Sequence, residues 1–430
     1  MEVTIHRGTK EIGGNCVEVS AGNTRLILDT GLPLVTEDRE PFDAGIIGKQ
    51  SVAELVERGV IPRVPGLFTD GPRPDAILLS HSHMDHSGLL HLTRPDIPIH
   101  ATTGTSKMMN AGSIFSRQPP LDRGRHRRVK SGHSKAVGDI TVTPFAVDHS
   151  AYGSVAYLLE AEGKTVLYSG DLRWHGRKPG MIHSLVAAAR RRRIDALIME
   201  GTHIGLDRGK RTTEEELQQK IEGLIAESRQ LVVSSFSPID VDRVVTYYKA
   251  AKAVGRVFVA DAYTAYVLHL VHREAKVPWP EKAGRLRVYF NKAFTRKKIQ
   301  KLEDRLARGR IELAEILANP TRYVMMFRPS MVEMDFGGRL PAGTRCLYSY
   351  WQGYLGNDDW TRCQDHLRSV GGDLVRAHTS GHIYKEDLVM FVNGVNPCTV
   401  IPIHTFEPGG FNALFSNARC LRDGETYCVE

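Results

Sequence analysis

The first half of the chain consists of short runs in which apolar and polar residues alternate, a pattern typical of β-strands. Residues 2–8 (EVTIHRG) alternate strictly, and residues 15–31 (NCVEVSAGNTRLILDTG) predict two strands joined by a Gly-Asn turn. Residues 154–171 predict a further hairpin. The front of the chain is therefore predicted to be rich in hairpins.

Four apolar runs in this half end in side chains that can bind a metal ion or transfer a proton. A buried strand that ends abruptly in polar residues is typical of a strand that delivers side chains to a site at its end. The residues at or near these four ends are His81, the pair Asp148 and His149, Asp171, and Glu200.

A different pattern begins near residue 212, where helical periodicity alternates with short apolar runs. Residues 212–228 start with a capping box, in which Thr213 precedes Glu216 by three residues. The alternation of strand and helix continues through residues 230–275 and predicts a parallel sheet with flanking helices. Residues 296–317 predict one long charged helical stretch.

The early pattern returns near residue 374, with a strand, a helix at 384–395 and a strand at 398–406. The simplest arrangement is a discontinuous outer domain interrupted by an α/β insertion. We predict the outer domain at residues 1–204 and 373–430 and the inserted domain at residues 205–372.

Composition limits the protein class without identifying a function. The chain has 430 residues, 41% hydrophobic and 25% charged, which is ordinary for a globular protein. There is no apolar run of roughly 20 residues and no apolar secretory segment at the start, so cytoplasmic localisation without a membrane partner is predicted. The 6 cysteines are scattered and predict reduced thiols rather than a disulfide framework.

The formal net charge of +8 favours a polyanionic partner such as nucleic acid. Three basic runs, at residues 123–130, 190–193 and 295–298, carry much of the excess. A single run of this kind is more often a solvated loop or helix end than a binding surface.

The stretch LLSHSHMDHSG, residues 78–88, contains the strongest candidate chemistry. Histidine and aspartate are good ligands for divalent ions of the zinc type. His81 and His83 are two residues apart in extended chain and point the same way, while Asp85 and His86 can face a second ion. His-x-His-x-Asp-His is far more specific than an isolated His-x-His pair.

This pattern resembles the signature of the metallo-β-lactamase superfamily. Residues 29–31 (DTG) resemble the superfamily's first motif, in which the aspartate is mainly structural. Residues 194–203 include LIMEGTH, which resembles the acidic motif of the β-CASP nucleases, the group that includes the ribonuclease J enzymes and the pre-mRNA 3′-end cleavage subunit. HTSGH (378–382) and IPIH (401–404) resemble the later motifs of that group. The implied fold is α/β: a metallo-β-lactamase αββα sandwich with an inserted β-CASP-like α/β domain.

The resemblance implies two divalent metal ions, zinc with manganese as the alternative. It assigns the ligands as His81, His83 and His149 for one ion, Asp85, His86 and His404 for the other, and Asp171 between them.

The resemblance also implies roles beside the metals. Glu200 would orient metal-ligating histidines, and Asp85 would accept a proton from the nucleophile as well as bind metal. His382 would face the substrate phosphate and stabilise developing charge, with His378 of the same motif as the competing residue. The acidic motif reads EGT rather than EST, and HTF replaces HGE after the closing histidine.

Two further segments are candidate phosphate contacts. FRPSM (327–331) offers Arg328 and Ser330, with a plain loop as the alternative. FSPIDVDR (236–243) opens a predicted helix and offers Ser237 and Arg243, with a structural capping turn as the alternative.

The predicted function is hydrolysis of a nucleic-acid phosphodiester by a hydroxide that two metal ions activate. RNA is the favoured substrate through the resemblance. A single strand is favoured over a duplex, because a buried metal centre cannot reach a phosphate packed on a rigid duplex. DNA cleavage, a lactonase or thioesterase activity, and a non-catalytic scaffold are the alternatives. The oligomeric state stays open, with a homodimer as one option.

Overall fold

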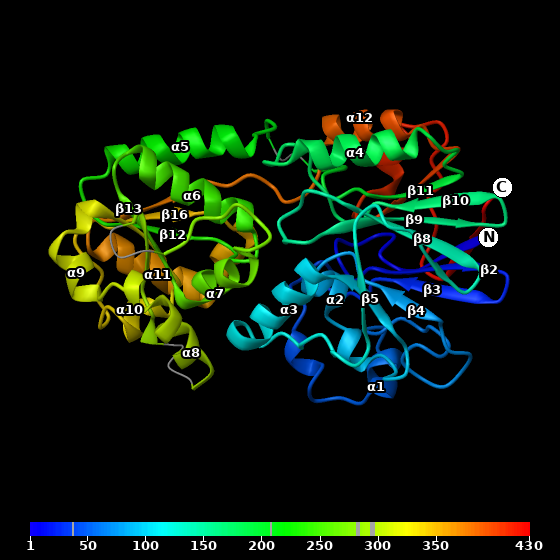
Figure 1. Ribbon diagram of the computed structural model, residues 1–430, viewed down its shortest axis with the longest axis horizontal. Helices are drawn as coiled ribbons and strands as arrows, with labels where there is room; N and C mark the ends of the chain where they lie inside the picture. Colours follow the sequence, from blue (N-terminus) through cyan, green and yellow to red (C-terminus); the bar gives the residue numbers. More distant parts are fainter. Residues whose placement is uncertain (37, 207–208, 281–283, 293–296) are drawn as a thin grey trace. The chain divides into compact units, whose positions relative to one another are not determined.

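The structure, a computed structural model, describes residues 1–430 except residues 37, 207–208, 281–283 and 293–296 (Figure 1). The chain divides into two compact units. Unit 1 combines residues Met1–Arg211 with Gly381–Glu430, and unit 2 contains Thr212–Ser380. The domain boundaries drawn from the sequence, with an inserted domain at 205–372, stay a prediction beside this division.

Unit 1 contains two mixed sheets, and the first has seven strands in the order β19-β1-β2-β3-β4-β5-β6. The antiparallel hairpin expected at residues 15–31 is present as β2 and β3, whereas the pairs from β3 to β6 are parallel. The strands of this sheet are β1 (Glu2–Arg7), β2 (Cys16–Ala21), β3 (Thr24–Leu28), β4 (Ala76–Leu78), β5 (Ile99–Thr102), β6 (His126–Val129) and β19 (Glu425–Cys428).

The second sheet has six strands in the order β18-β11-β10-β9-β8-β7. β7 to β10 pair antiparallel, and β10, β11 and β18 pair in parallel. The strands are β7 (Lys135–Val137), β8 (Ile140–Ala146), β9 (Val155–Ala161), β10 (Lys164–Tyr168), β11 (Ala196–Glu200) and β18 (Thr399–Ile403). The parallel pairing brings β18, from the end of the chain, beside β11.

The two sheets pack face to face, because alternate side chains of each strand enter one shared core. Val155, Tyr157 and Leu159 of β9 lie in the same apolar cluster as Leu26 and Leu28 of β3. The intervening residues of β9 pack on the opposite face, against helices. Period-two patterning with both faces buried thus produces the inner layers of a sandwich.

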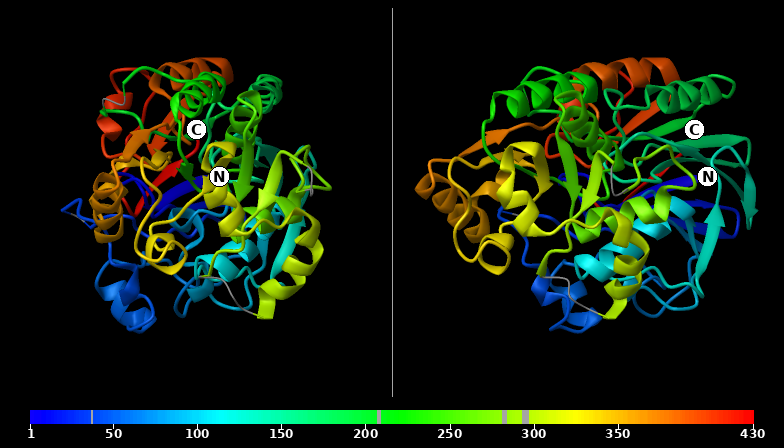
Figure 2. Two further views of the ribbon diagram at one scale, coloured as in Figure 1. Left: turned by 90° about the vertical axis from the view of Figure 1, so that its left-hand side faces the viewer. Right: turned by 60° about the vertical axis from the view of Figure 1, so that its left-hand side comes forward.

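Helices cover both outer faces of unit 1. The helices α4 (Pro179–Ala189) and α12 (Lys385–Val395) lie side by side on the second sheet, as Figures 1 and 2 show. The first sheet is covered by α1 (Val52–Glu57) and α3 (Thr103–Phe115), with the one-turn helix α2 (Met84–Ser87) at its edge. Unit 1 is therefore an αββα sandwich, as predicted.

Unit 2 is built on a six-stranded sheet of order β14-β13-β15-β12-β16-β17, in which every described pairing is parallel. This agrees with the strand–helix alternation of the sequence. The strands are β12 (Val232–Ser235), β13 (Val257–Ala260), β14 (Leu286–Val288), β15 (Tyr323–Met326), β16 (Arg345–Tyr348) and β17 (Asp373–Arg376). The helices are α5 (Glu214–Glu227), α6 (Val241–Ala253), α7 (Ala262–Val271), α8 (Lys297–Leu306), α9 (Leu313–Ala318), α10 (Met331–Met334) and α11 (Asp358–Ser369).

The single long helical stretch predicted at residues 296–317 is wrong. Helix α8 ends at Leu306, a 3-10 turn follows at Ala307–Gly309, and α9 begins only at Leu313. Between them the chain is extended, and the amide of Ile311 donates to the carbonyl of Val288 at 2.9 Å. Burying Ile311 beside the sheet therefore outweighs continuous helical propensity. Residue 296 itself lies outside the described residues.

Among the described residues, no helix combines the length and the apolar character needed to cross a membrane.

Candidate metal centre

The His-x-His-x-Asp-His stretch lies directly after β4 and spans a sharp change of backbone. His81 and His83 stand in the extended segment before α2, and Asp85 and His86 stand in the single turn of α2. The extended part presents two imidazoles together, and the helical turn directs the next two ligand candidates elsewhere. The short helix α2 is what separates the two ligand sets.

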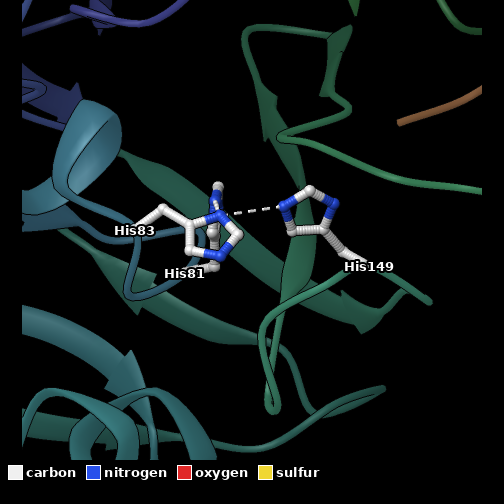
Figure 3. A group of neighbouring side chains, drawn as sticks. All are labelled: His81, His83 and His149. Carbon is white, nitrogen blue, oxygen red and sulfur yellow. Dashed lines mark hydrogen bonds between the residues drawn. The ribbon is translucent and has the colours of Figure 1, made fainter. Parts of the chain in front are cut away.

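The first cluster contains three imidazoles from two segments of unit 1: His81, His83 and His149, with one nitrogen of each within 4.8 Å of the others (Figure 3). The Nδ1 atom of His83 lies 3.1 Å from Nε2 of His81 and 3.1 Å from Nε2 of His149. His149 follows β8, and its Nδ1–H donates to the carbonyl of Gly381 at 2.6 Å. That hydrogen bond leaves Nε2 of His149 to face the cluster.

The second cluster joins four buried side chains, and their ligand atoms also lie within 4.8 Å of one another. They are Asp85, His86, Asp171 and His404. Nε2 of His86 lies 3.1 Å from Oδ2 of Asp171, and Nε2 of His404 lies 3.3 Å from Oδ2 of Asp85.

Asp171 connects the two clusters through one carboxylate oxygen. Its Oδ2 is 3.7 Å from Nε2 of both His81 and His149, and 3.8 Å from Nε2 of His404. Asp171 follows β10, and His404 follows β18 at the far end of the sequence. The structure therefore brings all seven predicted ligands into one site, while their binding of metal stays a proposal.

The pKa directions suit metal ligation. Burial lowers the pKa of His81 and of His149 well below the usual imidazole range, so both rings are neutral near pH 7 and retain a lone pair. For Asp171, burial acts in the opposite direction, but the imidazoles of His404 and His86 hold its pKa well below the ordinary value. The site thus combines neutral imidazoles at His81 and His149 with the ionised carboxylate of Asp171. At His86, burial is outweighed by the charges of Asp171 and Asp29, which raise the pKa of this imidazole well above its usual range.

Several buried polar atoms are left without hydrogen bonds, which is the observation that tests whether a cation fits. Within the part of the chain that the structure describes, Nε2 of His86 and both carboxylate oxygens of Asp171 make no hydrogen bond of good geometry, although Nε2 of His86 lies 3.1 Å from Oδ2 of Asp171. Leaving such atoms unsatisfied in a protein interior is costly. A bound divalent cation would satisfy these atoms. Imidazole nitrogen and carboxylate oxygen are ligands that zinc binds, so the residues fit the implied ions.

Asp29 holds one of the ligands from behind. Its carboxylate accepts from the backbone N–H of Ser80 at 2.7 Å, from the hydroxyl of Tyr168 at 2.7 Å and from Nδ1–H of His86 at 2.7 Å. The last contact directs Nε2 of His86 toward Asp171. The aspartate of the DTG motif is thus a ring-orienting residue, and Tyr168 and Ser80 are supporting residues that sequence reasoning missed.

Glu200 contacts the site mainly through its neighbours. Its carboxylate accepts from the backbone N–H of Leu172 at 2.9 Å and from the hydroxyl of Thr202 at 2.7 Å, and lies 3.1 Å from Nδ1 of His382. Burial disfavours the His382 imidazolium, but the charges of Glu200 and Asp171 outweigh burial and raise the pKa of His382 to about 9. The structure thus places Glu200 beside His382, and the predicted roles of both residues stay proposals.

A third set of residues also has metal-binding geometry. It consists of Asp171, Glu200, His382 and His404, and so shares two members with the second cluster. The competing histidine, His378, lies in unit 2, where its Nδ1 is 2.9 Å from the carbonyl oxygen of Ser349.

Gly201 explains the departure of the acidic motif from EST to EGT. A Cβ atom at this position would lie 2.5 Å from the ring of Phe411 and 3.1 Å from Cβ of Thr405. A serine would therefore displace the segment that follows His404. The missing serine contact reflects tight packing between the ends of β11 and β18.

The candidate substrate residues of unit 2 stand in two kinds of environment. Ser237, Arg328 and Ser330 follow the carboxyl ends of the neighbouring strands β12 and β15. Ligands of open α/β sheets bind at this edge. Arg328 is held by Asp261, with Nε 2.8 Å from Oδ2. Arg243 is buried and pairs with Glu214 at 2.8 Å, so it has a structural partner, and substrate binding by these four residues stays a prediction.

Comparisons with known proteins agree with this geometry. Residues 43–219 match the family described as "Beta-lactamase superfamily domain". The chain is similar to a ribonuclease J of Mycobacterium tuberculosis, with 25% identity covering 97% of this chain and 70% of that protein. It also resembles the transcription termination factor FttA of Methanothermobacter thermautotrophicus, with 25% identity over 55% of this chain and 37% of that protein.

One solved structure resembles the whole chain. It is a protein of unknown function from Enterococcus faecalis V583, with a TM-score of 0.79, 24% identity and coverage of 99% of both chains. That likeness supports the fold.

Proposed function

Because the chain belongs to the metallo-β-lactamase superfamily and, within it, to the ribonuclease J-like β-CASP family, we propose that it is a metal-dependent nuclease that hydrolyses RNA. One observation carries the proposal: Asp171 lies between two clusters of side chains that could hold metal ions, in a chain that is similar to a ribonuclease J along 97% of its length. The cations are zinc, with manganese as the alternative.

His81, His83 and His149 would hold one cation, Asp85, His86 and His404 the other, and Asp171 would touch both. Two bound cations supply Lewis acidity, which makes water acidic near neutral pH and neutralises charge on a phosphate.

Asp85 is the proposed proton acceptor. Burial opposes its ionisation, but the hydrogen bond and charge of His404 and the charge of His86 lower its pKa, so the carboxylate is ionised near pH 7 and carries no proton that would prevent it from accepting one. It is 8% exposed, whereas Asp171 is 1% exposed. Asp85 is therefore the carboxylate of the site with more access to water.

His382 is the proposed donor to the phosphate or to the leaving oxygen. With a pKa of about 9 it carries a proton at neutral pH, and its side chain is 21% exposed. Glu200 accepts from its Nδ1–H, so Nε2–H is the atom directed to substrate. Donating to developing negative charge stabilises a transition state more than a ground state.

The basic runs differ in what they offer a polyanion. In the first run, Arg123, Arg127, Arg128 and Lys130 are exposed, whereas Arg125 is buried. In the second run, Arg190 donates to the carbonyl of Gly394 and Arg192 pairs with Glu160. Of the third run, residues 295 and 296 lie outside the described residues. The first run is therefore the part of unit 1 that we propose attracts RNA.

The test is a turnover assay with single-stranded RNA and DNA labelled at either end, followed by panels of lactones and thioesters. The metal-loaded protein is expected to release RNA fragments, and Asp85→Asn is expected to release none while binding RNA normally. Turnover of lactones or thioesters alone would replace the nuclease with a small-molecule hydrolase. Equal cleavage of DNA would broaden the substrate.

A further inference from the structure

We infer that the hydroxyl group of Thr202 is a positioning element that fixes which nitrogen of His404 faces the second metal site. The inference deepens the proposed function and rests on it in one respect, the presence of a cation at His404. It concerns a residue two positions after Glu200, in the EGTH segment, to which the sequence alone assigns no role.

Thr202 lies where the ends of two parallel strands are joined. Glu200 is paired with Ile403 in the register of β11 and β18, and the amide of Gly201 donates to the carbonyl of Ile403 at 2.9 Å. Thr202 is 5% exposed. Its side chain is therefore held by the sheet beside the residue that follows β18, which is His404.

One oxygen atom contacts three ionisable side chains. The Oγ1 atom of Thr202 is 2.7 Å from Oε2 of Glu200, 2.8 Å from Nδ1 of His404 and 3.1 Å from Nδ1 of His382. A hydroxyl has a single proton to donate and two lone pairs to accept with. Once the hydroxyl donates to one of the three, the other two must donate their own protons to its oxygen.

The hydroxyl of Thr202 donates its proton to Oε2 of Glu200. The hydroxyl oxygen can then only accept, and Nδ1 of His404 must carry the hydrogen. In that tautomer the lone pair of His404 is on Nε2, the atom 3.3 Å from Asp85 and 3.8 Å from Asp171. Nδ1–H of His382 is shared between Thr202 and Glu200, each at 3.1 Å.

The contact is selective for one metal site. Among the described residues, the Thr202 hydroxyl has no hydrogen bond to His81, His83 or His149, whose rings have other neighbours. Removing the hydroxyl should therefore weaken the cation at the second cluster and leave the cation at the three-histidine cluster in place. A general loss of structure would affect both.

The experiment compares Thr202→Val, which removes the hydroxyl at nearly constant volume, with Thr202→Ser, which keeps it. Thr143→Val is the matched control, because Thr143 is also buried in unit 1 and its hydroxyl is 2.8 Å from that of Ser134, its one hydrogen-bond partner among the described residues. Zinc is titrated into metal-free protein against a chromophoric chelator. We expect two zinc ions per chain in the parent, the serine variant and the control.

For Thr202→Val we expect one ion bound as in the parent and a second bound about 10–100-fold more weakly, the range for loss of a group that orients a ligand. Two unchanged affinities would overturn the inference, and so would equal weakening of both sites. Weakened binding of the second zinc ion in Thr202→Ser would overturn it as well.

A second measurement uses the parent protein and so does not depend on any variant folding. Long-range proton–nitrogen correlation of ¹⁵N-histidine protein loaded with zinc reports which ring nitrogen bears hydrogen. The His404 resonance is expected to show hydrogen on Nδ1 and metal on Nε2; the opposite tautomer would overturn the inference. Neither readout involves RNA. Absence of RNA cleavage would therefore refute the proposed function, whereas the zinc affinities and the tautomer of His404 test the role of Thr202 independently.

Discussion

At the scale of single residues, the site depends on hydrogen bonds to the ring nitrogens that face away from its centre. His86 is held by Asp29, His149 by the carbonyl of Gly381, and His404 by Thr202. Each contact engages Nδ1 and leaves Nε2 for the centre. The sequence predicted which residues gather, because the motif types and their order are specific. It did not predict these partners, because a threonine or a backbone carbonyl has no distinctive spacing.

His382 gives the sharpest prediction at this scale. Replacing it by alanine should slow RNA hydrolysis by a factor on the order of 10²–10³, as for loss of an oxyanion donor, with metal content unchanged. Single-turnover rates and metal analysis of the same preparation measure both quantities. Loss of metal from His382→Ala would instead identify a metal-ion site formed by Asp171, Glu200, His382 and His404.

At the scale of elements, the ligand candidates follow strands that end at the same edge of the two sheets, and the loops at that edge pack very closely. Gly31 shows how close: a Cβ atom at this position would lie 1.8 Å from the carbonyl oxygen of Asp85 and 2.6 Å from the amide of Asn15. The glycine of the DTG motif therefore allows the ligand-bearing turn α2 to approach the end of β3. Periodicity predicted the strands but could not reveal this contact between segments distant in sequence.

Gly31→Ala should displace α2 and lower metal affinity, because the clash is with backbone atoms that cannot rotate away. Gly180→Ala is the control, since a Cβ there would have no atom of the described residues within 4 Å. Zinc affinity of the two variants, measured with a competing chelator, is expected to fall only for Gly31→Ala. Parent-like affinity in Gly31→Ala would show that α2 does not need this close approach.

The second prediction at this scale concerns the folding of unit 2. Burial, followed by the charge of Arg243, lowers the pKa of His378 to about 3, against an ordinary value of 6.5. Between these values the unfolded chain binds a proton that the folded chain does not, so stability should rise with pH from about 3 to 6.5. It should be nearly constant above that window as far as His378 is concerned.

His378→Asn keeps a polar group near Ser349 and removes this titration. Its unfolding free energy in urea, measured from pH 3 to pH 7, should depend less steeply on pH than that of the parent, by up to one proton. Identical slopes would mean that His378 is protonated normally in the folded protein.

At the scale of the whole molecule, the fold class followed from the sequence because patterning changes where the structure changes. The hairpin-rich front and the last segment of the chain form the sandwich of unit 1, and the strand–helix alternation forms the parallel sheet of unit 2. The broken stretch between Leu306 and Leu313 was missed, because burial of Ile311 beside β14 is a tertiary effect without a local signal.

The metal centre is also a property of the whole molecule. Its candidate ligands come from positions between 81 and 404, and His404 reaches the others because β18, from the end of the chain, pairs with β11. Metal binding and catalytic activity should therefore both depend on the folded chain and appear together.

The most direct measurement is the recovery of RNA hydrolysis when zinc is added stepwise to metal-free protein. We predict no turnover without metal, and a rise that is complete at about two equivalents per chain, as the two clusters require. Full turnover in excess chelator, or none after both equivalents have bound, would contradict the account.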